Sequence, residues 1–137
     1  MKNFARLPTV LAFALLALAL SSSAAAAQSK EAFTQERFEA LQAENALILI
    51  DVFADWCPTC ALQQDVLDEF RNEHPDVPVH TLSVNFDDQK EWVRHFKAPR
   101  QSTLILYRGE EQLWFSVAET RADRIVNEIL TAASRDR

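Results

Sequence analysis

The chain contains two cysteines, Cys57 and Cys60, and only two residues separate them. They follow the apolar run 47–53 and precede a segment with helical periodicity, so we expect a strand that leads through a short turn into a helix. This arrangement places Cys57 at the start of the helix, where unpaired backbone N–H groups and the helix dipole stabilise a thiolate. A thiolate is the nucleophile in disulfide exchange, and a nearby second sulfur can resolve the mixed disulfide. The spacing therefore indicates a redox-active pair.

Two other interpretations of the cysteines remain open. A structural disulfide across two residues closes a very small loop and so constrains the unfolded chain little. A zinc site needs four ligands, whereas one chain offers two thiols and the scattered histidines His74, His80 and His95. A metal or iron–sulfur site would therefore require ligands from two chains. We expect no metal site within one chain and no cofactor besides the redox-active disulfide.

Asp51 is the one polar residue in the strand predicted over residues 46–53. An isolated carboxylate inside an apolar strand is costly to bury unless it is paired or neutral. Burial raises the pKa of such a group, which suits a proton acceptor that works near neutral pH. We interpret Asp51 as a catalytic residue, and the alternative is a carboxylate turned towards a wet strand edge.

Strands and helices alternate along the rest of the chain. The predicted elements are a helix from the N-cap candidate Thr34 to about Ala43, a strand over 46–53, a helix from the cysteine turn to His74-Pro75, a strand over 77–84, a short helix that ends at Pro99, a hairpin of strands 103–107 and 113–117, and a last helix from Thr120. This order predicts one α/β domain with a central mixed β-sheet, helices on both of its faces, and a C-terminal hairpin followed by a helix.

The first 27 residues have the three parts of a secretory signal peptide. Residues 1–6 are basic, residues 7–20 are mostly apolar, and residues 21–27 are small and end in Ala-Ala-Ala. The alternative is an uncleaved membrane anchor, for which this apolar segment is short, because a bilayer span takes about 20 residues. We expect a signal peptide over 1–27, a domain over 28–137, and a periplasmic or secreted protein.

The charge of the chain restricts its partners. It carries 14 basic and 20 acidic side chains, a net charge of −6. Removal of Lys2 and Arg6 with the signal peptide would leave 12 basic side chains against 20 acidic ones, a net charge near −8. This negative net charge repels nucleic acid and anionic membranes, so we expect neither as a partner.

Residues 51–60, Asp-Val-Phe-Ala-Asp-Trp-Cys-Pro-Thr-Cys, resemble the active-site region of the thioredoxin superfamily, and the hairpin and last helix are similar to the second half of that fold. The resemblance covers essentially the whole chain after the signal peptide and implies a thioredoxin-like fold. It also implies that Cys57 is the attacking thiol and Cys60 the resolving thiol. Asp51 matches the buried carboxylate that helps to move the proton of the second cysteine, and Trp56 matches the aromatic residue beside the active site.

Two exported branches of the superfamily have similar sequences. Pro58-Thr59 resembles the thioredoxin-like reductases of cytochrome c maturation, although the chain lacks an obvious insertion of the kind found in that branch. Residues 53–56 are similar to the periplasmic thioredoxin-like domain of transmembrane electron carriers. The resemblance thus implies an oxidoreductase that reduces protein disulfides and is re-reduced by a membrane electron-transfer protein. We also expect the protein to be a monomer.

We assign substrate docking to the residues that flank the cysteines and to the loop that faces them in the superfamily. These residues are Trp56, Pro58, Thr59, Gln101, Ser102 and Thr103. In the superfamily this loop carries a cis-proline, whose position Ser102 occupies here, and it offers backbone groups to an extended substrate. Two further departures are Ser83, where many members have a lysine that pairs with the buried carboxylate, and Ala118, where a glycine is expected.

Ser102 changes what we expect of this loop. A cis bond before a residue other than proline costs about 3–4 kcal/mol, so we predict a trans Gln101–Ser102 bond or a rearranged loop. The serine hydroxyl can form a hydrogen bond with a cysteine sulfur. It also leaves room for a metal that proline would exclude, which keeps open a second function, a non-enzymatic module that binds a metal or iron–sulfur cluster or docks a partner. A neutral replacement that only reshapes the loop is a further alternative.

Overall fold

The computed structural model describes residues 28–135, and the predicted signal peptide lies outside them. The elements, in chain order, are β1 (Ser29–Ala32), α1 (Gln35–Ala43), β2 (Leu47–Phe53), α2 (Pro58–Glu73), β3 (Val79–Asn85), α3 (Lys90–His95), β4 (Thr103–Arg108), β5 (Glu111–Val117) and α4 (Ala122–Ser134). None of the helices in this part of the chain is long and apolar enough to cross a membrane.

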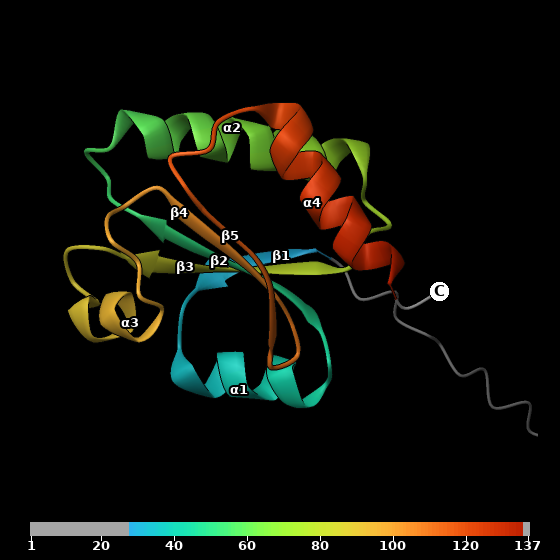
Figure 1. The fold of residues 1–137 in the computed structure, drawn as a ribbon, viewed down its shortest axis with the longest axis horizontal. Coiled ribbons are helices and arrows are strands. Elements are labelled where there is room, and N and C mark those ends of the chain that lie inside the picture. Colours follow the sequence, from blue (N-terminus) through green and yellow to red (C-terminus); the bar gives the residue numbers. More distant parts are fainter. Residues whose placement is uncertain (1–27, 136–137) are drawn as a thin grey trace, which may run out of the picture.

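The strands form one mixed sheet in the order β1-β3-β2-β4-β5 (Figure 1). β1, β3 and β2 run parallel, whereas β4 runs antiparallel to β2 and β5 antiparallel to β4. β2 is central, and its residues 47–52 are buried, as expected for a strand that is covered on both faces. The end of this strand leads into the cysteine turn, so the disulfide is anchored to the middle of the sheet.

Helices cover both faces of the sheet, as predicted. Figure 1 shows α2 and α4 on one face and α1 and α3 on the other. The core under α2 and α4 includes Leu67, Phe70 and Ile129, which are almost completely buried. The core under α1 and α3 combines aliphatic side chains with an aromatic cluster, whose members are Phe33, Phe38, Trp92, Phe96 and Tyr107. These two apolar layers hold the sheet between them.

The predicted order of elements omitted β1, and this part of the prediction is wrong. The sequence Ser-Lys-Glu-Ala has no apolar alternation, which is the pattern that indicates a strand. Its pairing with β3 is made by the backbone, and it continues past the strand where the Phe33 N–H donates to Ser83 O at 2.9 Å. The sheet therefore has a polar edge strand, which carries Lys30.

The starts of α1 and β3 show how local chemistry sets the ends of elements. Thr34 is the N-cap of α1, as predicted, and its hydroxyl accepts a hydrogen bond from the Arg37 N–H at 3.2 Å. β3 begins at Val79 rather than at Val77. Pro78 lies between them and has no N–H to donate to a neighbouring strand.

The last helix, α4, begins at Ala122 rather than at Thr120. The Glu119 carboxylate accepts hydrogen bonds from the backbone N–H groups of Thr120 and Arg121, at 3.1 and 2.9 Å. A side chain that binds its own neighbouring backbone offers an alternative to helical hydrogen bonds. The two residues therefore remain outside the helix.

Candidate active site

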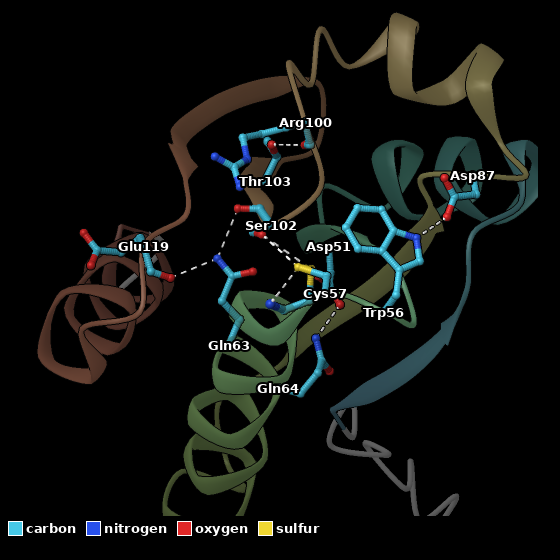
Figure 2. The surroundings of a disulfide bond; sticks show 11 residues. Asp51, Trp56, Cys57, Gln63, Gln64, Asp87, Arg100, Ser102, Thr103 and Glu119 are labelled. Atoms are coloured by element: carbon cyan, nitrogen blue, oxygen red, sulfur yellow. Dashed lines mark hydrogen bonds between the residues drawn. A yellow bond between two sulfur atoms is a disulfide. The ribbon is translucent and has the colours of Figure 1, made fainter.

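The two cysteines lie at the start of α2, directly after β2. Cys57 is the N-cap residue of α2, and Pro58 occupies the first helical turn, where its missing N–H costs nothing. The Cys60 N–H donates to Cys57 Sγ at 3.1 Å, so the sulfur acts as the side-chain cap. A disulfide joins the two residues, whose Cα atoms are 5.3 Å apart (Figure 2). The predicted position of Cys57 at the start of a helix is confirmed.

Ser102 contacts both sulfur atoms (Figure 2). Its hydroxyl lies 3.2 Å from Cys57 Sγ and 3.5 Å from Cys60 Sγ. Disulfide sulfurs carry no hydrogen, so the hydroxyl is the donor in this state. The residue is fully buried with a φ of 61°, and the Gln101–Ser102 bond is trans, as predicted. The predicted hydrogen bond between this hydroxyl and a cysteine sulfur is also confirmed.

Gln63 of α2 holds the Ser102 loop in place. Its Nε2 donates to Ser102 O at 3.2 Å and to Glu119 O at 2.9 Å. The Ala118 N–H donates to the same Ser102 oxygen at 2.8 Å. Nothing in the cysteine motif points to Gln63, although helical spacing places this polar residue on the otherwise apolar, buried face of α2. A buried glutamine at such a position needs polar partners, and here its Nε2 finds them in two loops, while its Oε1 has none among the described residues.

Ala118 adopts a φ of 55° directly after β5. Glycine enters this left-handed region without steric cost, whereas a residue with a Cβ does so at a cost. The expected glycine at this position therefore has a physical reason. The departure to alanine leaves the Ala118 N–H in its hydrogen bond to Ser102 O.

Asp51 lies on the central strand β2 and is fully buried, so the alternative of a wet strand edge is wrong. Its Oδ2 accepts a hydrogen bond from Gln64 Nε2 at 2.6 Å, while its buried Oδ1 has no hydrogen-bond partner among the described residues. Burial raises the pKa of Asp51 from 3.8 to about 6, against the opposing effects of the Gln64 hydrogen bond and of the charges of Lys30 and Arg71. The predicted rise in pKa is confirmed, and it suits a group that exchanges a proton near neutral pH.

A cavity of about 570 Å³ lies beside the disulfide, on the side of Asp51. Its walls include both cysteines and the side chains of Asp51, Gln64, Lys30 and Ser83. Ser83 is paired with Asp51 in the register of β2 and β3, and its hydroxyl is buried without a hydrogen-bond partner in residues 28–135. Because serine is much shorter than lysine, the departure at this position leaves space next to the carboxylate.

The residues predicted to dock a substrate on the cysteine side differ in exposure. Trp56 is 61% exposed, and its Nε1 donates to Asp87 Oδ2 at 2.7 Å, which fixes the ring beside the disulfide (Figure 2). Pro58 is exposed and Thr59 is half-buried. All three surround Cys57, and their role in docking stays a prediction.

The loop residues predicted to dock a substrate are less accessible. Gln101 is half-buried, whereas Ser102 and Thr103 are fully buried. The Thr103 hydroxyl donates to Arg100 O at 2.7 Å, so this side chain is used within the loop. Their role in docking also stays a prediction.

The structure keeps the histidines apart. His74 caps the end of α2, His80 lies on β3 and His95 on α3. Within residues 28–135, no three His, Cys, Asp or Glu side chains lie close enough together to hold a metal ion.

Comparison with known proteins decides the family. The Thioredoxin family model matches residues 28–131. The chain belongs to the thioredoxin family. Its architecture is the thioredoxin-like α/β fold, with a five-stranded mixed sheet, flanking helices, and a C-terminal hairpin and helix, as the resemblance of residues 51–60 implied.

Several thioredoxins are similar to this chain in sequence. Thioredoxin of Chlamydia trachomatis is 30% identical over 93 residues, which cover 68% of this chain and 88% of that protein. Thioredoxin of Alicyclobacillus acidocaldarius is 36% identical over 62 residues, 45% of this chain and 58% of that protein. Thioredoxin-T of Drosophila melanogaster is 33% identical over 67 residues, 49% of this chain and 42% of that protein. The match thus spans less than two thirds of the length of the last two relatives.

A solved structure gives a fuller match. Trxlp from Edwardsiella tarda is 34% identical and superposes with a TM-score of 0.69, over 73% of this chain and 97% of that one. The chain therefore carries the Cys57–Cys60 disulfide on a thioredoxin-family fold.

Proposed function

We propose that this protein is an exported oxidoreductase that reduces disulfides of other proteins through a Cys57/Cys60 cycle. The observation that carries the proposal is the environment of Cys57 Sγ at the N-terminus of α2. Two donors lie within reach of this sulfur, the Cys60 N–H at 3.1 Å and the Ser102 hydroxyl at 3.2 Å. Hydrogen bonds to the charged sulfur and the start of a helix both lower the pKa of a thiol. Cys57 is therefore the thiolate that begins the reaction.

The cycle consists of two disulfide exchanges. The Cys57 thiolate attacks one sulfur of a substrate disulfide, the substrate S–S bond breaks, and the other substrate sulfur leaves as a thiolate. Cys60 then loses its proton and attacks Cys57 Sγ, which forms the Cys57–Cys60 disulfide and releases the second substrate sulfur. Two electrons pass from the dithiol to the substrate.

Asp51 is the proton acceptor for Cys60. Among the described residues, Cys60 Sγ has one hydrogen-bond contact, with the Ser102 hydroxyl at 3.5 Å, whereas Cys57 Sγ has two, so the Cys60 thiolate is less stabilised than that of Cys57. With a pKa of about 6, Asp51 is mostly ionised at neutral pH and can take up this proton. The protonated Asp51 then returns the proton to the released substrate thiolate or to solvent.

Protein substrates dock around Cys57. The exposed ring of Trp56 offers a rigid apolar contact, and Pro58 and Thr59 extend this surface along the start of α2. On the other side of the disulfide, the loop over residues 101–103 offers backbone groups to an extended substrate segment.

The signal-peptide pattern of residues 1–27 supports an export to the periplasm or beyond the cell. Because such compartments are oxidising, a reductase there needs a supply of electrons, for which we propose a membrane electron-transfer protein. The acidic balance of the chain, with a net charge of −6, makes nucleic acid an unsuitable partner. We propose that the protein acts as a monomer.

The test of this function is reduction of insulin disulfides by the purified protein with dithiothreitol as the reductant. The direction of electron flow follows from the reduction potential of the pair, measured against glutathione. A reductase has a potential near that of thioredoxin, about −270 mV, whereas a value near about −120 mV belongs to an oxidant. Cys57→Ser is the control, since it removes the nucleophile and leaves the rest of the site.

The alternative function is a module that holds a metal or iron–sulfur cluster between two chains. The observation that favours it is Ser102, which stands beside both sulfurs where the superfamily has proline. Absorbance and metal content of the freshly purified protein separate the two functions. A visible chromophore or stoichiometric metal in a dimer supports the cluster, and a colourless monomer that reduces insulin supports the redox cycle.

A further inference from the structure

Three polar side chains from three elements form a connected row beside the disulfide. Lys30 Nζ, from β1, donates to Gln64 Oε1, and Gln64 Nε2, from α2, donates to Asp51 Oδ2 at 2.6 Å (Figure 2 shows the second bond). All three side chains line the same cavity of about 570 Å³. We propose that Gln64 and Lys30 are positioning residues of the redox cycle, which hold the Asp51 carboxylate and control its protonation. This inference rests on the proposed function, because it assigns a purpose to the proton acceptor of that cycle.

The chemistry of the amide explains why both partners are needed. Gln64 has an acceptor oxygen at one side of its amide and donor hydrogens at the other. An ammonium group can only donate, so Lys30 requires the oxygen on its side. The donor hydrogens of Gln64 are then turned towards Asp51, and a flipped amide would bring two like partial charges together at both ends. Lys30 therefore orients the hydrogen bond that the carboxylate accepts.

The pairing of the strands explains why this role falls to β1. Ser83 is the neighbour of Asp51 on β3, and its short side chain is uncharged. A positive charge from β3 is therefore missing next to the carboxylate at this position. β1 is the next strand beyond β3, and its Lys30 reaches the carboxylate through the Gln64 amide.

Other charged groups also face Asp51. Arg71, on α2, adds a second positive charge that lowers the pKa of this carboxylate, while burial, the largest effect, raises it to about 6. Two acidic residues besides Asp51 line the cavity, Glu31 from β1 and Asp55 after β2. Glu31 is paired with Arg37 at 3.0 Å, which reduces its influence. The cysteines carry no charge while the disulfide is closed.

The consequence concerns the second exchange of the cycle. Asp51 Oδ1 is buried without a hydrogen-bond partner among the described residues, and Asp51 and Cys60 line the same cavity. This oxygen is therefore free to take the proton from Cys60 Sγ while Oδ2 stays bound to Gln64. Loss of the row would raise the protonated fraction of the buried carboxylate at neutral pH, so fewer molecules could accept that proton.

The experiment measures the titration of Asp51 directly, by carbon-13 NMR of its carboxyl group in the oxidised protein. The variants are Gln64→Leu, Lys30→Gln and Lys30→Arg, and Lys97→Gln is the matched control, since it makes the same charge change at an exposed residue outside the cavity. We expect the midpoint to rise by about one pH unit in Gln64→Leu and by less in Lys30→Gln. Lys30→Arg keeps the charge and the donor, so its midpoint stays near that of the wild type, as does that of Lys97→Gln.

Unchanged midpoints in both Gln64→Leu and Lys30→Gln would overturn the proposal. If Gln64→Leu does not fold, Lys30→Gln decides, because Lys30 is exposed and its replacement leaves the core intact. The titration requires no turnover, so a failure of the proposed function leaves its result unaffected. A second readout is the pH dependence of mixed-disulfide resolution, which shifts upward with the midpoint when the row acts on the cycle, whereas an unshifted profile counts against it.

Discussion

The two sides of the disulfide differ in how their polar atoms are satisfied. On the Ser102 side, the hydroxyl contacts both sulfurs and the carbonyl oxygen accepts two hydrogen bonds, from Gln63 and Ala118. On the Asp51 side lies a cavity, and one carboxylate oxygen has no hydrogen-bond partner in residues 28–135. Both polar groups of Ser102 are bonded, which can fix the position of a sulfur atom, although Gln63 Oε1 on this side is buried without a partner among the described residues. On the other side, the spare oxygen belongs to a carboxylate, which can take up a proton. We infer that the Ser102 side positions the sulfur atoms and that the Asp51 side exchanges the proton.

Two neighbouring glutamines of α2 connect the helix to these two sides. Successive residues of a helix point about 100° apart, so Gln63 and Gln64 face different directions. Figure 2 shows Gln63 directed to Ser102 and Gln64 directed to Asp51. Both serve the site through their amide donors, yet the first is bound to two carbonyl oxygens and the second to a carboxylate. One glutamine thus holds the Ser102 loop, and the other influences the protonation of Asp51.

The largest effect is expected from the cysteines, which separate the two exchanges. Cys60→Ser removes the resolving thiol, so turnover is lost and mixed disulfides with partner proteins accumulate. These adducts are detected by non-reducing electrophoresis of the compartment that holds the protein. Cys57→Ser is the control and gives no adducts, because it lacks the attacking sulfur. Equal trapping by both variants would mean that the two sulfurs are not specialised.

The next effect belongs to the Asp51 side. Asp51→Asn keeps the shape of the side chain but cannot accept a proton, so the resolution of a mixed disulfide at neutral pH should slow by about 100-fold. In the wild type this rate rises as pH passes the Asp51 pKa of about 6, and in the variant that step in the pH profile is absent. Stopped-flow kinetics of the second exchange measure both. An unchanged rate in the variant would remove Asp51 from the mechanism.

Asp51→Asn should also change stability, with a sign that depends on pH. The pKa of Asp51 is raised in the folded protein, so the folded state binds the proton more tightly than the unfolded state, and stability is lost as pH rises from 3.8 through about 6. Ionisation of this one group then lowers the free energy of unfolding by at most about 3 kcal/mol. We expect the variant to be more stable than the wild type above that range and close to it below, as measured by urea unfolding. Equal stability at all pH values contradicts the raised pKa.

On the Ser102 side, the expected effect is smaller and concerns the first exchange. Ser102→Ala removes one of the two donors to Cys57 Sγ, so the pKa of the Cys57 thiol should rise by roughly one unit in the reduced protein. Ultraviolet absorbance of the thiolate measures this titration. Gln63→Leu leaves the hydroxyl in place but frees the loop, so its thiol pKa should rise less than in Ser102→Ala. The reverse order would assign the effect to the loop rather than to the hydroxyl.

The parts of the site that have strong local signals are predictable from the sequence. A Cys-x-x-Cys turn after an apolar strand, and a lone carboxylate within that strand, are patterns that assign Cys57, Cys60 and Asp51 to the site. Gln63 and Gln64 were not predicted, because a polar residue on an amphipathic helix reveals neither its direction nor its partners. β1 was not predicted, because its place in the sheet depends on backbone pairing rather than on an apolar pattern. The position of Lys30 beside Asp51 was therefore not predicted either.

The smallest expected effect tests how rigidly the Ser102 side is held. Ala118 has a φ of 55°, and its N–H binds Ser102 O, so Ala118→Gly relieves the left-handed backbone without removing the hydrogen bond. We expect stability to rise by about 0.5–1 kcal/mol. Ala40→Gly is the matched control inside α1, where the same substitution lowers stability by about 1 kcal/mol. Ala118 lies next to Ser102 O, which accepts hydrogen bonds from Gln63 Nε2 and from the Ala118 N–H. If Ala118→Gly raises stability and leaves the pKa of the Cys57 thiol unchanged, these two hydrogen bonds already fix the loop.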